Sequence, residues 1–392
     1  MVIELTILDW VLLGVLAFLF LTQVYFYARY MAAPARKLRR DKKAEGINGL
    51  ADEELPGVSV ILAAHNESFN LSQYLQALLT QDYPTYEVIV VDDGSEDDTR
   101  AVVERYMTRD PRLHMTFVPY GARVQSTKKL ALTLAAKAAQ YNYLLLTDAD
   151  CRPESSQWIR QMMSGFKEGT DIVLGFGAYF YDKGTLNRLI RFDTLFNGLH
   201  YLGAALCGHP YMGVGRNLAY RKDFFFESGG FTHMMTNRAG DDDLFVNRVA
   251  TKANTNVVLS RESITWSVAK TSWRDWWQQK QRHLSVSPSY RRITQFRLTL
   301  EPLSRGLFYA LLIGIMVYQL PITDYHILPI PLLAAIGVFL IRWILQTAIL
   351  NVSARRMGLH RFSMWSVLWY DILLPLITLW ILAIPKRKNN KW

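Results

Sequence analysis

The sequence predicts an α/β domain with a mostly parallel sheet, flanked by one N-terminal and about three C-terminal apolar helices that span or lie on a membrane. Two observations predict this class. Four apolar stretches lie near the ends of the 392-residue chain, and 50% of all residues are hydrophobic. Between these stretches, short β-rich runs alternate with helical runs, which is typical of a parallel sheet with helices on both faces.

The first apolar stretch, about residues 5–27, is long enough to cross a bilayer core of about 30 Å as a helix. It begins in the acidic sequence MVIELTILDW and is followed by the basic sequence ARYMAAPARKLRRDKK, whereas a secretory signal peptide begins with basic residues. By the positive-inside rule, residues 1–30 form an uncleaved anchor with the N-terminus outside. Residues 31–56 then form a basic juxtamembrane linker in the cytoplasm.

The C-terminal region, residues 301–392, is predicted to be a second membrane region. Its apolar stretches lie at about 306–322, 327–350 and 364–384. The link around 323–326 has no Lys or Arg, whereas the next link is rich in arginine, so the two links are expected on opposite sides of the membrane. A fourth full span would place the basic tail KRKNNK outside, against this rule. Either the tail is an exception, or the last stretch, which contains Asp371 and Pro375, is re-entrant or interfacial.

The net charge of +10 is concentrated beside the apolar stretches, in segments 29–43, 270–297 and 352–361 and in the tail. Anionic lipid head groups and phosphate-bearing substrates account for this distribution better than nucleic acid does. We therefore expect membrane lipids as partners and no nucleic acid. Cys151 and Cys207 show no metal-ligand spacing and are predicted to be free thiols.

The central segment has the alternating pattern of a parallel α/β sheet. Strands are predicted at Val58–Ala63, Glu87–Val91, His114–Val118, Tyr143–Thr147 and Ile172–Phe176. Helices are predicted at Leu71–Thr80, Asp98–Thr108, Lys128–Gln140 and Ser155–Phe166. In such sheets ligands bind at the carboxyl ends of the strands, so the residues after each strand are the candidates for chemistry.

Polar or acidic side chains follow three of these strands at the same edge of the sheet. They are His65 and Glu67 after the first strand, Asp92 and Asp93 after the second, and Asp148 and Asp150 after the fourth. Taken singly, each acid is compatible with a turn or a helix cap. Their coincidence at one edge favours a ligand site.

Asp148 and Asp150 are the most informative pair. Two carboxylates two residues apart repel each other unless a cation or hydrogen bonds intervene. A hard divalent ion accepts one or two carboxylates and completes its shell with water and phosphate oxygens, which suits a nucleotide diphosphate leaving group. The alternative is an exposed acidic turn, with which the nearby Pro153 is compatible.

Three ordered segments resemble the motifs of inverting family-2 glycosyltransferases of GT-A fold: VSVILAAHNE, QDYPTYEVIVVDDGSEDDT and LLLTDAD. The resemblance spans about residues 57–282, more than half of the chain. It implies that residues 57–270 form a GT-A (Rossmann-like) catalytic domain that binds a nucleotide-diphosphate sugar, for which uridine is the family's common nucleotide.

The resemblance also implies roles for individual residues. Those expected around the nucleotide sugar are Ala63, His65, Glu67, Asp93, Lys128, Asp148, Gln279 and Arg282. Asp93 would read the base, and Lys128, in the element KKLAL that is similar to the family's K-x-x-A-L, would approach the phosphates. Asp148 would sit near the ribose, and Asp150, together with Asp148, would bind Mg²⁺ or Mn²⁺.

The acceptor side is expected in the next motifs. GVGRNLAYRKDFFFESGGF resembles the family's G-x-x-x-A-[FY]-R element. The alternative interpretation of the same residues is a β-hairpin with glycine bends. In the acidic run that follows, Asp242 would be the general base, with Asp241 and Asp243 beside it. If the alignment with the family motif is shifted by one residue, Asp243 would be the base instead. Neighbouring negative charges raise a carboxyl pKa toward the working range of a base. The alternative is an acidic helix N-terminus.

The segment 271–300 is predicted to be an amphipathic interfacial region. It resembles the Q-x-x-R-W element of membrane-bound members, with Gln279 and Arg282 matching and His283 in place of Trp. Arg282 would bind the leaving phosphates. The departure at His283 weakens the case for a processive polymer synthase.

We therefore expect an inverting, single-displacement glycosyltransferase, integral to a membrane such as the bacterial inner membrane, with its catalytic domain in the cytoplasm. The donor is a nucleotide-diphosphate sugar, and the acceptor is a hydroxyl of a lipid or lipid-linked glycan. The alternatives are a synthase or subunit that extends a cell-surface polysaccharide, and a non-catalytic membrane subunit that binds nucleotide sugars.

Overall fold

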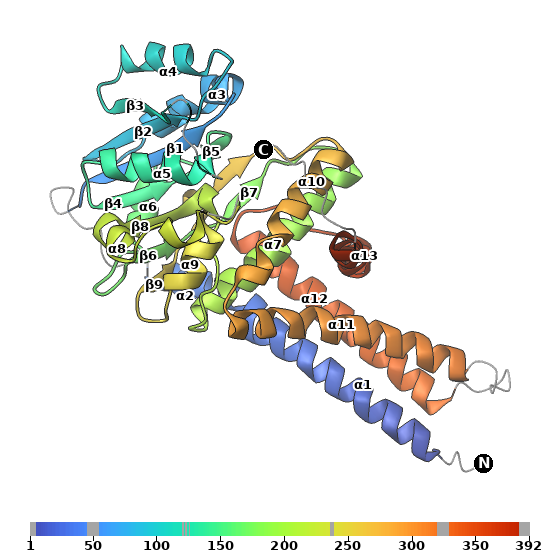
Figure 1. Ribbon diagram of the computed structural model, residues 1–392. Coiled ribbons are helices and arrows are strands. Elements are labelled where there is room, and N and C mark those ends of the chain that lie inside the picture. Colours follow the sequence, from blue (N-terminus) through green and yellow to red (C-terminus); the bar gives the residue numbers. More distant parts are fainter. Residues whose placement is uncertain are drawn as a thin grey trace.

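The computed structural model describes residues 5–44, 55–119, 121, 124, 126–235, 239–319 and 329–383. Its main sheet has seven strands in the order β3-β2-β1-β4-β8-β6-β9 (Figure 1). The strands are β1 (Val58–Ala64), β2 (Tyr86–Asp92), β3 (Leu113–Phe117), β4 (Tyr143–Leu146), β6 (Ile172–Leu174), β8 (Leu218–Arg221) and β9 (Thr255–Val257). All of them run in one direction except β8, which is antiparallel to both neighbours. The predicted mostly parallel fold is confirmed.

Helices cover both faces of this sheet. One face is covered by α3 (Ser68–Leu79), α4 (Thr99–Met107) and α6 (Trp158–Met163). The other is covered by α5 (Thr127–Ala138), α7 (Thr185–Leu206) and α9 (Asp243–Val249). Alternate strand residues enter the two cores, so that Val60 faces the first and Ile61 the second. Burial on both faces explains why the central strands β1, β4 and β6 are almost wholly apolar.

A smaller sheet lies at the carboxyl edge of the main one. It consists of β5 (Cys151–Pro153), β10 (Thr265–Ser267) and β7 (Gly177–Tyr179) in the order β5-β10-β7. Helix α10 (Trp273–Leu284) follows β10. An ion pair of 2.6 Å between Lys280 and Asp193 holds α10 against α7.

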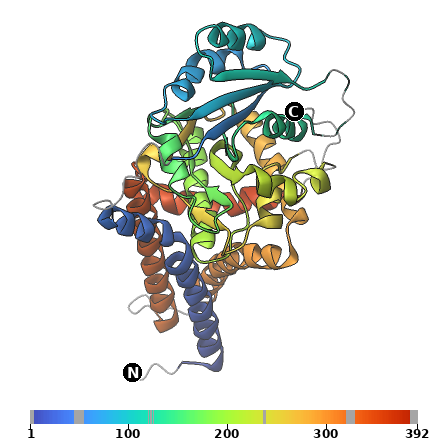
Figure 2. The same ribbon diagram turned by 90° about the vertical axis from the view of Figure 1, so that its left-hand side faces the viewer.

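Four helices are long and apolar enough to cross a membrane. They are α1 (Ile7–Phe26), α11 (Arg292–Gln319), α12 (Ile330–Arg356) and α13 (Met364–Ala383). The first three lie side by side, whereas α13 lies across them; it is seen end-on in Figure 1 and lengthwise in Figure 2. This orientation favours an interfacial position over a fourth span. The link around 323–326 and the basic tail lie outside the described residues.

Asp371 explains how α13 is held across the other helices. Its side chain is fully buried, and its Oδ1 accepts hydrogen bonds from Arg305 of α11 (2.9 Å) and Gln346 of α12 (2.7 Å). Its Oδ2 accepts from Tyr309 (2.6 Å) and Arg342 (2.9 Å). Four donors occupy all the acceptor positions of one carboxylate, so this buried charge is both paired and satisfied.

The N-terminal apolar helix joins the α/β domain through α7. The π-helix Tyr27–Met31 and helix α2 (Ala33–Ala44), which continue α1, both pack on α7. The contact is close because Gly203 has no side chain: a Cβ there would collide with the carbonyl group of Tyr30. Backbone packing at this contact therefore fixes the orientation of the α/β domain relative to α1.

Candidate active site

The carboxyl ends of β1 and β2 bring together the residues predicted for the nucleotide pocket. Ala63 pairs with Val91 in the parallel ladder, and His65 follows the end of β1. The Nδ1 atom of His65 lies 2.7 Å from the carbonyl oxygen of Asp93, whose own N–H donates to Ala64 over 2.8 Å. His65 and Asp93 are 28 residues apart in the sequence, and the parallel pairing of β1 with β2 brings them into contact.

Two acids at this edge lie in partly desolvated positions. Asp93 is buried, desolvation raises its pKa, and its Oδ2 has no hydrogen-bond partner among the described residues. Glu67 accepts a hydrogen bond of 2.6 Å from Asn70. Desolvation, together with the charges of Asp150 and Asp148, raises the pKa of Glu67. The first and fourth strands therefore do present their acids to the same space.

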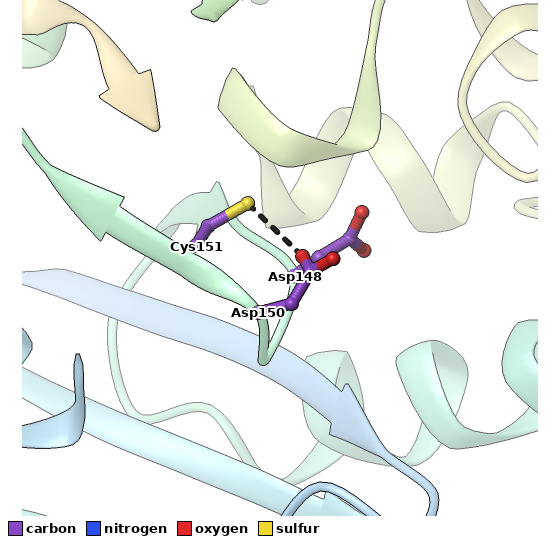
Figure 3. Close-up of side chains that lie close together, drawn as sticks. All are labelled: Asp148, Asp150 and Cys151. Carbon is purple, nitrogen blue, oxygen red and sulfur yellow. Dashed lines mark hydrogen bonds between the residues drawn. The ribbon is translucent and has the colours of Figure 1, made fainter. Parts of the chain in front are cut away.

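Asp148 and Asp150 lie in the turn between β4 and β5, beside Cys151 (Figure 3). One ligand atom from each of the three side chains lies within 4.8 Å of the others. The Cys151 thiol donates to Asp150 Oδ1 over 3.4 Å and lies 3.2 Å from the hydroxyl of Ser267. Desolvation and the charge of Asp148 raise the pKa of Asp150.

This turn fits a hard divalent cation. Carboxylate oxygens are suitable ligands for Mg²⁺ and Mn²⁺, and two of them so close together favour a cation between them. Desolvation raises the pKa of the Cys151 thiol well above its usual value, and a neutral thiol is a poor ligand. Asp150 with Asp148 would therefore hold the ion, as the sequence predicts, and Cys151 would not.

Lys128, in the first turn of α5, links this turn to the acidic run before α9. Its Nζ lies 2.9 Å from Asp148 Oδ1 and 3.3 Å from Asp241 Oδ2. Desolvation opposes the charged form of Lys128, but these carboxylates outweigh it and hold the pKa of the ammonium group well above its usual value. Desolvation likewise opposes the ionised form of Asp148, yet Lys128 lowers the pKa of that carboxyl group.

The predicted base lies at the start of α9. Asp242 is the N-cap residue: its Oδ1 accepts from the Asp243 N–H (2.8 Å) and its Oδ2 from the Gly215 N–H (2.6 Å). Desolvation and the charge of Asp241 raise the pKa of Asp242 to about 6. Desolvation and Asp242 raise the pKa of Asp243 to about 7, and Asp243 also accepts a hydrogen bond of 2.8 Å from Tyr290. The helix N-terminus that the sequence offered as an alternative is present and carries the perturbed acids.

Arg216 is a site residue to which the sequence assigned no role. Its guanidinium group donates to the carbonyl oxygens of Gly177 (3.1 Å) and Ala178 (3.2 Å). It also lies 4.3 Å from the centroid of the Tyr179 ring, a cation–π contact. Strand β7 therefore holds this cation in place.

A hydrogen bond to Ser267 brings Arg216 near the β4–β5 turn: its guanidinium group donates to Ser267 Oγ over 3.1 Å, and this hydroxyl lies 3.2 Å from the thiol of Cys151. The charge of Arg216 favours the ionised forms of both Asp148 and Asp150. The arginine stands in the motif GVGRNLAYR, but its spacing does not reveal that the side chain reaches β7. The arginine in this motif was therefore the only signal in the sequence, and it does not indicate where the side chain lies in the fold.

The end of α10 completes the site. Gln279 Nε2 donates to the Tyr179 hydroxyl over 3.3 Å, so it supports the ring under Arg216. Arg282 is among the cations that lower the pKa of Asp148. Among the predicted residues, Gln279 acts through Tyr179.

Comparison with solved structures identifies a similar fold in the mannosyltransferase PcManGT from Pyrobaculum calidifontis, solved in complex with GDP-Man and Mn²⁺. The TM-score is 0.52 at 20% sequence identity, covering 87% of this chain and 99% of that one. At this identity the likeness shows a shared fold, of the GT-A type that the sequence predicts.

Two relatives extend the comparison to sequence. The glycosyltransferase AglE of Haloferax volcanii is 31% identical over 146 residues, which cover 36% of this chain and 46% of AglE. The probable glycosyltransferase YdaM of Bacillus subtilis is 27% identical over 240 residues, which cover 59% of this chain and 55% of YdaM. The chain thus spans about half the length of these relatives.

The fold and these comparisons place the chain among glycosyltransferase families, and its structure contains four candidate membrane-spanning helices. The profile of glycosyl transferase family 21 matches residues 18–389, and the chain belongs to this family. The predicted resemblance to family-2 glycosyltransferases is thereby confirmed at the level of a family-2-like protein. The roles of individual site residues stay predictions.

Arg216→Gln is expected to lower kcat by about 10–100-fold, the cost of losing one charge-assisted interaction at the site. Arg216→Lys should recover part of the rate, because it restores the charge but not the fork that binds two carbonyl groups. Initial rates of nucleotide release and a thermal unfolding midpoint would be measured for both variants. A rate loss that is equal in both and tracks unfolding would show a structural role only.

Proposed function

We propose that this protein is an inverting glycosyltransferase that moves a sugar from a nucleotide-diphosphate sugar to a hydroxyl group of a lipid or lipid-linked acceptor, on the cytoplasmic side of a membrane. One observation carries the proposal. Lys128 contacts Asp148, on the donor side, at 2.9 Å and Asp241, next to the candidate base, at 3.3 Å. The base and the leaving group would therefore lie close enough for a direct displacement.

In the proposed reaction, Asp242 accepts the proton of the acceptor hydroxyl while that oxygen attacks the anomeric carbon. The bond from this carbon to the phosphate oxygen breaks on the opposite side, and the nucleotide diphosphate leaves with the electron pair. Two backbone N–H groups, from Gly215 and Asp243, hold the Asp242 carboxylate in position. A single displacement needs one base and forms no covalent sugar–enzyme intermediate.

The donor would be held by cations and by one unpaired acceptor. Lys128, Arg216 and Arg282 supply positive charge for the diphosphate. A divalent cation held by Asp150 and Asp148 would add positive charge to the departing phosphates. Asp93 Oδ2, which is buried without a partner in the described part of the chain, would accept a hydrogen bond from the nucleobase of the donor.

The lipid acceptor is proposed from the position of the site. Helix α10, which carries Gln279 and Arg282, packs on the crosswise helix α13. The outer face of α13 exposes Trp365, Trp369 and Trp380, residues typical of a membrane interface. An acceptor with its apolar part in the bilayer would therefore reach the site from the same side.

The proposal is tested by incubating detergent-purified protein with a panel of nucleotide sugars and Mg²⁺ or Mn²⁺, with and without a membrane-lipid extract. The expected result is metal-dependent, lipid-stimulated release of one nucleotide diphosphate and a glycosylated lipid product. A long polymer as product would instead support a synthase, the activity named for a Staphylococcus epidermidis relative that is 31% identical over 98 residues. Folded protein that binds a nucleotide sugar but never releases the nucleotide would support the non-catalytic alternative.

The proposal predicts that kcat/KM falls as the pH drops through about 6. Transfer needs the ionised form of Asp242, whose pKa desolvation and Asp241 raise to about 6. Well below that pH, the ionised fraction falls about tenfold per pH unit. The profile would be measured at saturating metal over about two pH units on either side.

Asp241→Asn is the control for this profile. It removes one negative neighbour of Asp242, so the acid limb should move to lower pH. An acid limb that stays in place would assign the titration to another group.

A further inference from the structure

A groove lies on the outer face of α12, toward the end of this helix nearest the catalytic domain. Its volume is about 300 Å³. Its apolar part is formed by Ile344, Ala348, Val352 and Met364, and its charged end by Arg355 and Arg361. The residues contributed by α12 recur every three or four positions and so form one helix face.

The two arginines at the charged end have no acidic partner in the described part of the chain. Both are exposed, and neither forms an ion pair with any residue that the structure describes. By contrast, Arg342 of the same helix pairs with Asp371, and Arg356 donates to the carbonyl group of Ala35. Within the described ranges, the groove therefore ends in two positive charges that no acidic side chain compensates.

The loop that carries Arg361 is held in place. Asn351 on α12 donates to the Phe362 carbonyl and accepts from the Phe362 N–H, both over 2.8 Å. Trp343 donates to the Met364 carbonyl over 2.9 Å. These bonds place Arg361 at the groove before any ligand arrives, which reduces the entropy lost on binding.

We propose that this groove binds one anionic phospholipid, with its head group between Arg355 and Arg361 and an acyl chain along the apolar part. From Ile344 to Arg355 the helix rises roughly 16 Å at about 1.5 Å per residue. One leaflet contributes about half of a hydrocarbon core that is about 30 Å thick, so the groove matches a head group and its chain. An anionic head group is preferred because the cation of a zwitterionic lipid would face two arginines.

The site would be tested on full-length protein in detergent by native mass spectrometry. Phosphatidylglycerol and phosphatidylcholine with the same acyl chains are the probes, and retained lipid is measured as a function of concentration. The wild type is expected to retain phosphatidylglycerol preferentially. Removing both charges in Arg355→Gln/Arg361→Gln should weaken this binding at least about tenfold.

The matched control is Arg39→Gln/Arg40→Gln, which removes the same charge from exposed positions of the basic helix α2. Phosphatidylglycerol binding should be unchanged in this variant. An equal loss in both double variants would overturn the proposal, because it would show a non-specific attraction of basic segments for anionic lipid.

Two further arms separate a lipid from other occupants. Ala348→Trp fills the apolar part without changing the charge, and it should also weaken phosphatidylglycerol binding. Glycerol phosphate, the head group alone, should not compete. Competition by glycerol phosphate at the affinity of the lipid would mean a simple phosphate site, and dimers lost in Ala348→Trp would mean a protein contact; either result would overturn the proposal.

Discussion

Asp242→Asn is expected to lower the rate of sugar transfer by about 10²–10⁴-fold, the usual contribution of a general base. The amide keeps the volume of the side chain but cannot take the proton of the acceptor hydroxyl. Donor affinity should change little, because the hydrogen bonds of Asp242 go to backbone N–H groups on the acceptor side. Initial rates at saturating donor, with calorimetric titration of the donor, separate the two quantities.

Asp243→Asn and Tyr290→Phe test whether the base is assigned to the correct position. Tyr290 donates to Asp243 and to neither oxygen of Asp242, so Tyr290→Phe perturbs Asp243 selectively. If Asp242 is the base, both of these variants keep most of the activity. If Asp243→Asn causes a larger loss of activity than Asp242→Asn, the general base is Asp243 and not Asp242.

Five of the seven strands of the main sheet were predicted, because the central strands are buried on both faces and read as continuous apolar runs. Strands β8 and β9 were not predicted as strands. The prediction Val58–Ala63 differs from β1 (Val58–Ala64) by one residue. Strands β5, β7 and β10 were not predicted, because three residues carry no periodicity and form a strand only by pairing with distant segments. Hydropathy also could not orient α13, because its direction depends on the bonds of Asp371 to α11 and α12.

The candidate site was predictable where it follows from strand ends. Asp93, Asp148 and Asp150 stand at the carboxyl ends of parallel strands, and the sheet topology alone brings such residues together. Arg216 could not be placed in this way, because its position depends on hydrogen bonds to β7, which lies far from it along the chain. The link from Asp148 through Lys128 to Asp241 likewise needed coordinates.

Asp150→Asn is expected to lower metal-dependent transfer by about 10²–10³-fold, with no recovery at higher Mn²⁺ concentration. Asparagine keeps one oxygen but removes the charge that a hard cation needs. Because Asp148 and Asp150 repel each other in the β4–β5 turn, removing one charge should not lower the thermal unfolding midpoint. Loss of activity in a protein of unchanged stability would therefore identify a functional carboxylate.

Cys151→Ser is the matched control, since its thiol contacts Asp150 at 3.4 Å but is not an expected ligand. A wild-type metal response in Asp150→Asn, or its equal loss in Cys151→Ser, would contradict the assignment.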